Sequence, residues 1–139
     1  MTVIADSSFI YALFNTNETR HSDAALFALT NTAPLLVPDI ILPEICYLFS
    51  RDFGYSGVIT FLELYQKFDA PFEPPLKSDL PRMHEIAEAY ASAAFDIVDC
   101  CIMALAERLQ VTRIATFDRR DFSIFRPSHC EFLELLPRS

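Results

Sequence analysis

Glycine is scarce in this chain. Gly54 and Gly57 are the only two glycines among 139 residues. Loops that cradle nucleotide phosphates need several glycines at fixed spacing, as in G-x-G-x-x-G or the Walker A sequence. Neither pattern can be written here, so dinucleotide binding and P-loop nucleotide hydrolysis are excluded.

The chain also lacks a long uninterrupted apolar run. Its most apolar stretch, 35–49, is broken by two prolines and two acidic residues, well short of the roughly 20 residues that a transmembrane helix needs. No basic segment precedes an apolar run at the N-terminus, so no secretory signal is expected. We therefore expect a cytoplasmic protein with no membrane partner.

Basic residues are outnumbered by acidic ones. The chain has 11 Lys and Arg against 19 Asp and Glu, which gives a formal net charge of −8. This balance argues against binding of nucleic acid through a broad basic face. A nuclease is not excluded, because divalent cations held by carboxylates reverse the local sign and can bind a phosphate.

Cysteine and histidine show no metal-binding pattern. Cys46, Cys100, Cys101 and Cys130 contain no C-x-x-C spacing, and the two adjacent cysteines cannot easily pair with each other. We expect reduced thiols in the core. The three histidines lie far apart in the sequence, so ordinary surface or capping roles are favoured over a zinc site.

The hydrophobic content is high enough to fold one domain over residues 1–139. Apolar residues make up 52% of the sequence, and 13 residues are Phe. Hydrophobic burial can therefore stabilise this chain without disulfide or metal cross-links. Any metal is then expected to be functional rather than structural.

The apolar pattern alternates between strands and helices. Short apolar runs predict strands at 2–5, 35–37, 113–116 and 131–135, with a short edge strand at 72–73 in a proline-rich segment. Helical spacing predicts helices at 9–14, 22–30, 40–51, 58–68, 81–92 and 96–110. Serines at 7 and 8 are expected to cap the first helix, and the helices at 40–51 and 58–68 to form a hairpin. This alternation predicts an α/β protein with a parallel sheet.

Two aspartates directly follow predicted strands. Asp6 and Asp118 are expected at the carboxyl edge of the sheet, where open parallel sheets bind their ligands. An aspartate beside a helix start is also a common N-cap, and either residue taken alone would favour that structural role.

Two more aspartates begin the helix at 96–110. Asp96 fits the N-cap position, which places Asp99 at the third helical position on the same side as the buried stripe. A carboxylate facing inward needs a partner. We assign Asp96 to structure and Asp99 to a metal, with the reverse assignment as the main alternative.

Glu44 is the only charged residue between Asp39 and Arg51. An acid in such an apolar helix is costly unless something compensates its charge. The alternative is a first-turn glutamate that interacts favourably with the helix dipole.

Four segments together resemble a known family, the PIN domains, and in particular the VapC-like toxin ribonucleases of bacterial toxin–antitoxin pairs. They are Ala5–Ser8, Pro38–Tyr47 with Glu44, Asp99–Ala106 and Ala115–Phe122. Each segment alone is a weak signal, but their order and spacing are specific. The resemblance covers nearly the whole chain.

The resemblance implies a fold and a function. The fold is a three-layer α/β/α sandwich around a parallel sheet of four to five strands. Asp6, Glu44, Asp99 and Asp118 are the implied catalytic and metal-binding residues, and Mg²⁺ or Mn²⁺ is the implied cofactor. The implied substrate is RNA, and the implied partners are a second copy of the chain and a small antitoxin protein that blocks the site.

Several neighbouring residues have two interpretations. Ser7 and Thr116 are expected to orient the carboxylates, although each also fits a turn or strand end. Arg119 and Arg120 suit substrate phosphates or surface ion pairs equally well. Asp121 is interpreted as a helix or turn cap.

Two other functions compete with the nuclease. An inactive PIN-fold module that binds protein or RNA has no need for clustered carboxylates, so the four acids favour the enzyme. A phosphotransfer domain of the receiver kind fits poorly, since no second acid lies beside Asp6 and no lysine lies near the later strand ends.

Overall fold

A computed structural model describes residues 1–138, which form a five-stranded parallel sheet with the order β3-β2-β1-β4-β5. The strands are β1 (Val3–Ala5), β2 (Leu35–Pro38), β3 (Phe72–Glu73), β4 (Arg113–Ala115) and β5 (Glu134–Leu136). The helices are α1 (Ser7–Phe14), α2 (His21–Thr30), α3 (Leu42–Phe53), α4 (Tyr55–Tyr65), α5 (Leu80–Ala89), α6 (Ile97–Leu109) and α7 (Arg120–Ile124). Short 3₁₀ turns at Asp39–Ile41 and Lys77–Asp79 precede α3 and α5.

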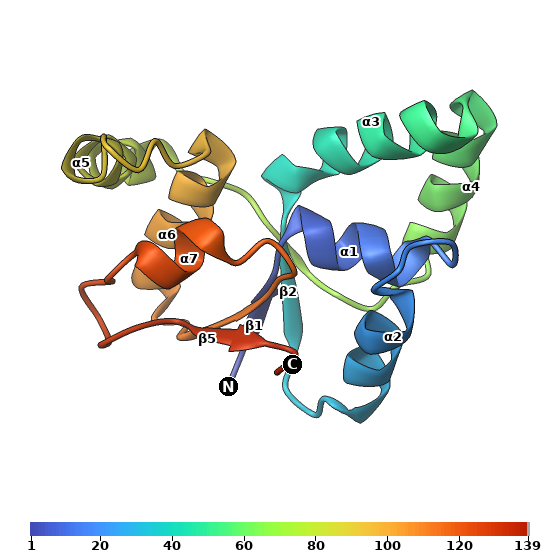
Figure 1. The fold of residues 1–139 in the computed structure, drawn as a ribbon, viewed down its shortest axis with the longest axis horizontal. Coiled ribbons are helices and arrows are strands. Elements are labelled where there is room, and N and C mark those ends of the chain that lie inside the picture. Colours follow the sequence, from blue (N-terminus) through green and yellow to red (C-terminus); the bar gives the residue numbers. More distant parts are fainter. Residues whose placement is uncertain (139) are drawn as a thin grey trace.

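Helices cover both faces of the sheet. Figure 1 shows α1, α2, α3 and α4 on one side of the strands and α5, α6 and α7 on the other. The predicted three-layer α/β/α sandwich is therefore confirmed, as is the predicted edge strand β3. Proline-rich sequence is tolerated there because an edge strand is paired on one side only.

The core lies between the sheet and the central helices. Strand β1 is buried throughout, and so is the α6 segment from Cys100 to Glu107. A helix that is apolar on all sides must be surrounded by protein, which explains why α6 lies between the sheet, α5 and α7 (Figure 1). All four cysteines are free, as expected.

The helices α3 and α4 form the predicted hairpin. Gly54 turns the chain between them with φ of +73°, a left-handed conformation that a side chain rarely adopts. The rings of Phe61 and Tyr65 pack edge-on against Phe14 of α1, at centroid distances of 5.3 and 5.4 Å. Leu62 of α4 is 39% exposed, although helical spacing places an apolar residue there.

Several predicted element boundaries are wrong. Ser7 and Ser8 lie inside α1, and the N-cap is Asp6. Helix α5 ends at Ala89, before the predicted 92, and the Tyr90 ring after it stacks on Phe95 at a centroid distance of 4.8 Å. Strand β5 begins at Glu134 rather than at residue 131, after a loop that leaves Phe132 57% exposed.

Among residues 1–138, no helix combines the length and the apolar character that crossing a membrane requires.

Candidate active site at the carboxyl edge of the sheet

The two central strands place Asp6 and Asp118 at the same edge of the sheet. Strands β1 and β4 are neighbours, with Ala5 opposite Ala115, and the Asp6 amide donates to the Ala115 carbonyl at 3.1 Å. Each aspartate follows the last residues of its strand. Carboxyl ends of parallel strands meet at one edge, so residues distant in sequence face a common region.

Asp6 is buried, and both of its carboxylate oxygens accept hydrogen bonds. Oδ1 accepts from the Phe9 amide at 3.0 Å, which caps α1, and from the Ser8 hydroxyl at 2.8 Å. Oδ2 accepts from the hydroxyl of Thr116. The structural N-cap role and the position at the sheet edge therefore belong to the same residue.

Ser8, not Ser7, supplies the hydroxyl that supports Asp6. Ser8 Oγ also accepts from the Phe117 amide at 2.9 Å, which ties α1 to the loop after β4. Ser7 lines the acidic hollow, but its hydroxyl bonds to nothing within residues 1–138. The sequence has two adjacent serines. Their side chains point in different directions from the helix, and only that of Ser8 reaches the Asp6 carboxylate. Thr116 does hold Asp6, as predicted.

The start of α6 separates the roles of Asp96 and Asp99. Asp96 is the N-cap, and its carboxylate accepts from the Val98 amide at 2.9 Å, as predicted. Asp99 lies in the first turn and is half-buried, whereas Asp96 is exposed. The geometry matches the assignment of Asp96 to capping, and the metal role of Asp99 stays a prediction.

Glu44 reaches the site from the first turn of α3. Pro43 lies beside it at the start of the helix, where a missing amide hydrogen costs no helical hydrogen bond. The Glu44 side chain is exposed rather than embedded, and it lines the same hollow as Asp6. The apolar sequence around Glu44 suggested that its charge would be buried at a cost. Because the side chain is exposed to solvent, that cost does not arise.

Asp121 joins the site, although the sequence suggested only a cap. It lies in the first turn of α7, whose N-cap is Arg119. Its Oδ2 accepts from the Asp96 amide at 3.0 Å and its Oδ1 from Arg120 at 2.7 Å. The buried Asp121 carboxylate therefore links α7 to the start of α6. Its proximity to Asp99 depends on tertiary packing, so the sequence carried no local signal for it.

A hollow of about 380 Å³ collects six carboxylates at this edge. They come from the turn between β1 and α1, from α3, from the start of α6, from the loop after β4 and from α7. The six residues are Asp6, Glu44, Asp96, Asp99, Asp118 and Asp121. The four predicted catalytic acids are thus brought together. Among residues 1–138, Arg120 is the only basic residue that lines this hollow.

Burial and neighbouring carboxylates raise the pKa values of Asp6 and Asp99. Burial raises the pKa of Asp6 to about 6, against the lowering effect of its hydrogen bonds from Thr116, Phe9 and Ser8. The pKa of Asp99 is also raised, first by burial, then by its bond to the Asp121 carboxyl and by the charge of Asp6. Desolvation and like charge both disfavour ionised carboxylates. A bound cation would relieve both effects.

The donor set fits a hard divalent cation. All six acids offer oxygen ligands, which Mg²⁺ and Mn²⁺ prefer over nitrogen and sulfur. Within the described part of the chain, no three His, Cys, Asp or Glu side chains stand close enough together to hold one ion directly. Mg²⁺ is commonly held by one or two carboxylates and keeps several waters, so the wider spacing suits water-mediated binding.

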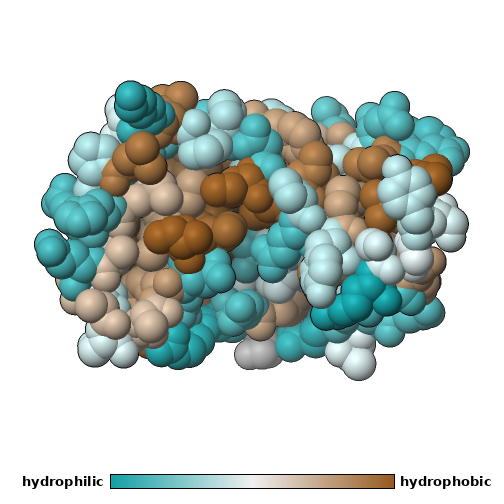
Figure 2. Space-filling view, turned by 90° about the horizontal axis from the view of Figure 1, so that it is seen from above, coloured by the Kyte–Doolittle hydropathy of each residue, from teal (hydrophilic) through white to brown (hydrophobic). Residues whose placement is uncertain are grey.

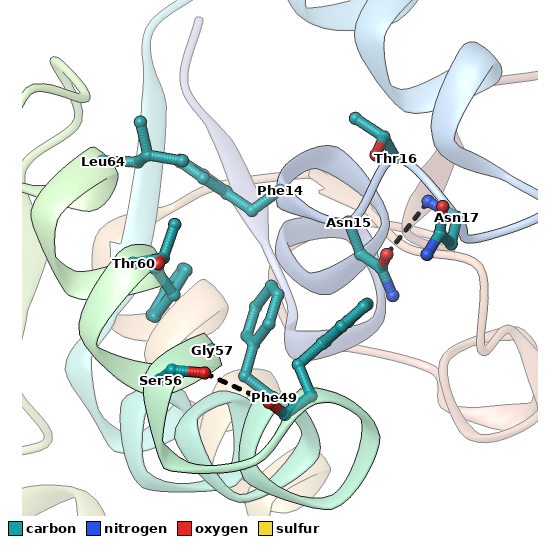
Figure 3. Close-up of a pocket in the computed structure, with 11 residues that line it drawn as sticks. Phe14, Asn15, Thr16, Asn17, Phe49, Ser56, Gly57, Thr60 and Leu64 are labelled. Atoms are coloured by element: carbon teal, nitrogen blue, oxygen red, sulfur yellow. Dashed lines mark hydrogen bonds between the residues drawn. The ribbon is translucent and has the colours of Figure 1, made fainter.

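A second hollow of about 460 Å³ lies between the end of α1 and the hairpin helices (Figure 3). Phe14, Phe49 and Leu64 project toward it, and Asn15 accepts from the Asn17 amide at 3.0 Å at its rim. No acidic or basic side chain lines it. It therefore lacks the groups for acid–base or metal chemistry.

The fold and the acidic hollow together define an α/β protein with a carboxylate site at the edge of a parallel sheet. The family model described as the PIN domain matches residues 3–126. The chain belongs to the PIN domain family, as the sequence motifs predicted.

Individual relatives agree with this assignment. Ribonuclease VapC26 of Mycobacterium tuberculosis (strain ATCC 25618 / H37Rv) is 24% identical over 125 residues, which cover 90% of this chain and 93% of the relative. Among solved structures, Mycobacterium tuberculosis VapC20, described as a sarcin–ricin loop cleaving toxin, matches with a TM-score of 0.79 and 18% identity. That match covers 92% of this chain and 98% of VapC20.

A second solved structure is VapBC2 from Rickettsia felis, bound to a DNA fragment from its promoter. It matches with a TM-score of 0.71 and 14% identity, over 98% of each chain. At these identities the two structures show a shared fold only. The roles of individual residues must be argued from the contacts and charges of the site in this chain.

Proposed function

We propose that this chain is a divalent-metal-dependent endoribonuclease and the toxin of a toxin–antitoxin pair. The observation that carries the proposal is the convergence of Asp6, Glu44, Asp99 and Asp118 on one hollow at the carboxyl edge of the sheet. Membership of the PIN family and the similarity to a ribonuclease support it.

The proposed cofactor is Mg²⁺ or Mn²⁺, held by these four acids with Asp121 close by. When bound, such an ion supplies Lewis acidity that activates water and offsets the charge of a phosphodiester. A polyanionic RNA would otherwise be repelled by the six carboxylates of the hollow.

The protein residues have distinct roles in this proposal. Thr116 and Ser8 fix the Asp6 carboxylate through hydrogen bonds to its two oxygens, so Asp6 needs little rearrangement to bind a cation. Asp96 caps α6 and thereby sets the position of Asp99 one turn further along. Mobile carboxylates would hold the ion less tightly and place the substrate less accurately.

The proposal includes two protein partners and a cytoplasmic location. An antitoxin partner is suggested by the similarity to a VapBC complex. Self-association is suggested by the α3–α4 hairpin, where Ile59 is 55% and Leu64 is 47% exposed. Apolar side chains gather in several patches on the face seen from above, separated by hydrophilic ones (Figure 2). Such patches favour protein interfaces.

RNA cleavage by the purified protein tests the proposal directly. A structured RNA labelled at the 5′ end in one reaction and at the 3′ end in another should yield labelled fragments of intermediate length from both ends in Mn²⁺. Chelation by EDTA should stop the reaction, and added Mn²⁺ should restore it. Absence of cleavage across a panel of structured RNAs would favour the inactive binding module instead.

A further inference from the structure

The acidic hollow continues into a smaller one of about 250 Å³ that shares Ser7, Glu44 and Asp118 with it. The smaller hollow lies along α1 and α3 and beside the loop after β4. Its remaining lining includes Arg20, Arg51 and Phe117. Two arginines and an aromatic ring therefore adjoin the carboxylates on this side.

Arg20 ends a stack of three planar groups. The Phe117 ring stacks on Phe9 at a centroid distance of 5.9 Å, and the Arg20 guanidinium lies 4.4 Å from the Phe117 centroid. Arg20 Nε donates to Asp23 at 3.0 Å, in an exposed ion pair that is weak in water. The Arg20 side chain is 41% exposed, so it keeps accessible surface beside the Phe117 ring.

Arg51 is fixed in place by its neighbour and by α1. Its Nε and Nη2 donate to Asp52 at 2.8 and 3.0 Å, and the Tyr11 hydroxyl donates to the same carboxylate. Nη1 of Arg51 has no hydrogen-bond partner within residues 1–138. A held guanidinium with a free donor is suited to binding a phosphate oxygen.

The opposite side of the acidic hollow offers no comparable cation. Arg120 donates from Nη1 to Asp121 at 2.7 Å and from Nη2 to the Ala93 carbonyl at 2.7 Å. Both of its terminal amino groups are therefore engaged with the protein. Glu18 also lines the smaller hollow and would oppose a phosphate beside it.

We propose that the smaller hollow binds the nucleotide next to the cleaved phosphodiester of a single-stranded RNA segment, with its base on the Arg20 guanidinium and its far phosphate on Arg51. This inference rests on the proposed ribonuclease function and adds the side on which the RNA strand continues. Unstacked RNA bases commonly stack on aromatic rings and on arginine planes. Contact with Phe117, which itself stacks on Phe9, limits the motion of the Arg20 guanidinium.

RNA affinity measured without cleavage tests this site. Fluorescein-labelled adenosine and uridine octamers are titrated with protein in Ca²⁺, and binding is followed by fluorescence anisotropy. Arg51→Gln and Arg20→Gln should each raise the Kd about fivefold, the effect of losing one charge-assisted contact. Lys67→Gln is the matched control, since it removes one charge from an exposed residue that lines neither hollow.

Substitution of the two arginines should affect RNA binding in different ways. Arg51→Gln should make the salt dependence of log Kd shallower by about 0.7, the value for one phosphate contact on a single strand. Arg20→Gln should reduce the preference for adenosine over uridine, because purines stack more extensively. Glu18→Gln should tighten binding of both octamers. Circular dichroism establishes that each variant is folded.

Equal Kd values for the arginine variants and Lys67→Gln would overturn the inference, as would failure of the folded wild type to bind either octamer. The ribonuclease proposal is judged separately by cleavage in Mn²⁺. If the wild type cleaves RNA but both arginine variants bind RNA like the control, the ribonuclease proposal is retained. Only the proposed nucleotide site is then rejected.

Discussion

The hydroxyl of Thr116 donates a hydrogen bond to the Asp6 carboxylate across 110 positions of sequence. The same hydroxyl accepts from the Asp118 amide at 3.0 Å. Thr116 is fully buried, so water does not replace this bond readily. One side chain thereby fixes both the acid that follows β1 and the loop that carries Asp118.

Thr116→Val tests this relationship, because it keeps the shape and removes the hydroxyl. Loss of a hydrogen bond to a buried carboxylate should lower stability by about 1–3 kcal/mol and weaken Mn²⁺ binding about tenfold. Ser7→Ala is the control and should change neither, since its hydroxyl bonds to nothing in the described chain. Titration calorimetry and thermal melts measure both quantities. Equal behaviour of the two variants would mean that Thr116 does not position the acids.

The stability of the metal-free protein should fall as pH rises from about 5 to about 7.5. The folded pKa of Asp6, about 6, lies above its unfolded value of 3.8, so the folded state holds the proton more tightly. Ionisation through this window removes about 1 kcal/mol at Asp6 alone, and the raised pKa of Asp99 acts in the same direction.

Thermal melts in EDTA measure this pH dependence. Asp6→Asn should flatten it, since asparagine retains the cap and cannot ionise. Carboxylates with lowered pKa values, such as Asp52, are already ionised above about pH 5 and do not oppose the trend. A melting temperature that rises across this range in EDTA would contradict the crowding of acids described here.

Mn²⁺ should stabilise the folded protein at neutral pH. The ion binds the assembled carboxylates and scarcely binds the unfolded chain, so ion at about tenfold its Kd should raise the melting temperature by about 4 °C. Asp99→Asn should lose most of this increase, and Asp96→Asn should keep it. A wild-type melting temperature indifferent to millimolar Mn²⁺ would favour a fold without a metal site.

Self-association should depend on the α3–α4 hairpin. Ile59→Lys or Leu64→Glu should convert a dimer at tens of micromolar, roughly the scale of weak association, into a monomer in sedimentation velocity. Leu29→Lys is the control, because Leu29 is 84% exposed on α2 and outside the hairpin. A monomeric wild type would mean that the chain does not self-associate. A dimer that the hairpin variants leave unchanged would mean that the interface lies elsewhere.

The sequence predicted the fold better than the details of the site. Strand and helix periodicities located β1, β2 and β4, and the position of Asp6 and Asp118 after strands predicted a common edge. These features depend on short-range pattern and on the general geometry of parallel sheets. Local sequence singled out Glu44 and separated Asp99 from Asp96, and the family resemblance joined them with Asp6 and Asp118 in one implied site.

Features that depend on tertiary packing were not predictable in the same way. Asp121 joins the site because α7, a five-residue helix, packs against the start of α6. Ser8 rather than Ser7 supports Asp6 because of helix phase, which two adjacent serines do not reveal. The contact between Arg20 and Phe117 joins positions that lie 97 residues apart in the sequence.

RNA cleavage by Asp99→Asn and Asp96→Asn, compared with wild type in Mn²⁺, tests the central claim most directly. Asparagine keeps the shape of aspartate and loses its charge, and it caps a helix about as well. Asp99→Asn should therefore abolish cleavage while remaining folded, and without metal it should be as stable as wild type or more so, because asparagine cannot ionise in this buried, acidic surrounding. Asp96→Asn should retain most of the wild-type activity. An active Asp99→Asn beside an inactive, folded Asp96→Asn would contradict the assignment of Asp99 to the metal and Asp96 to the cap.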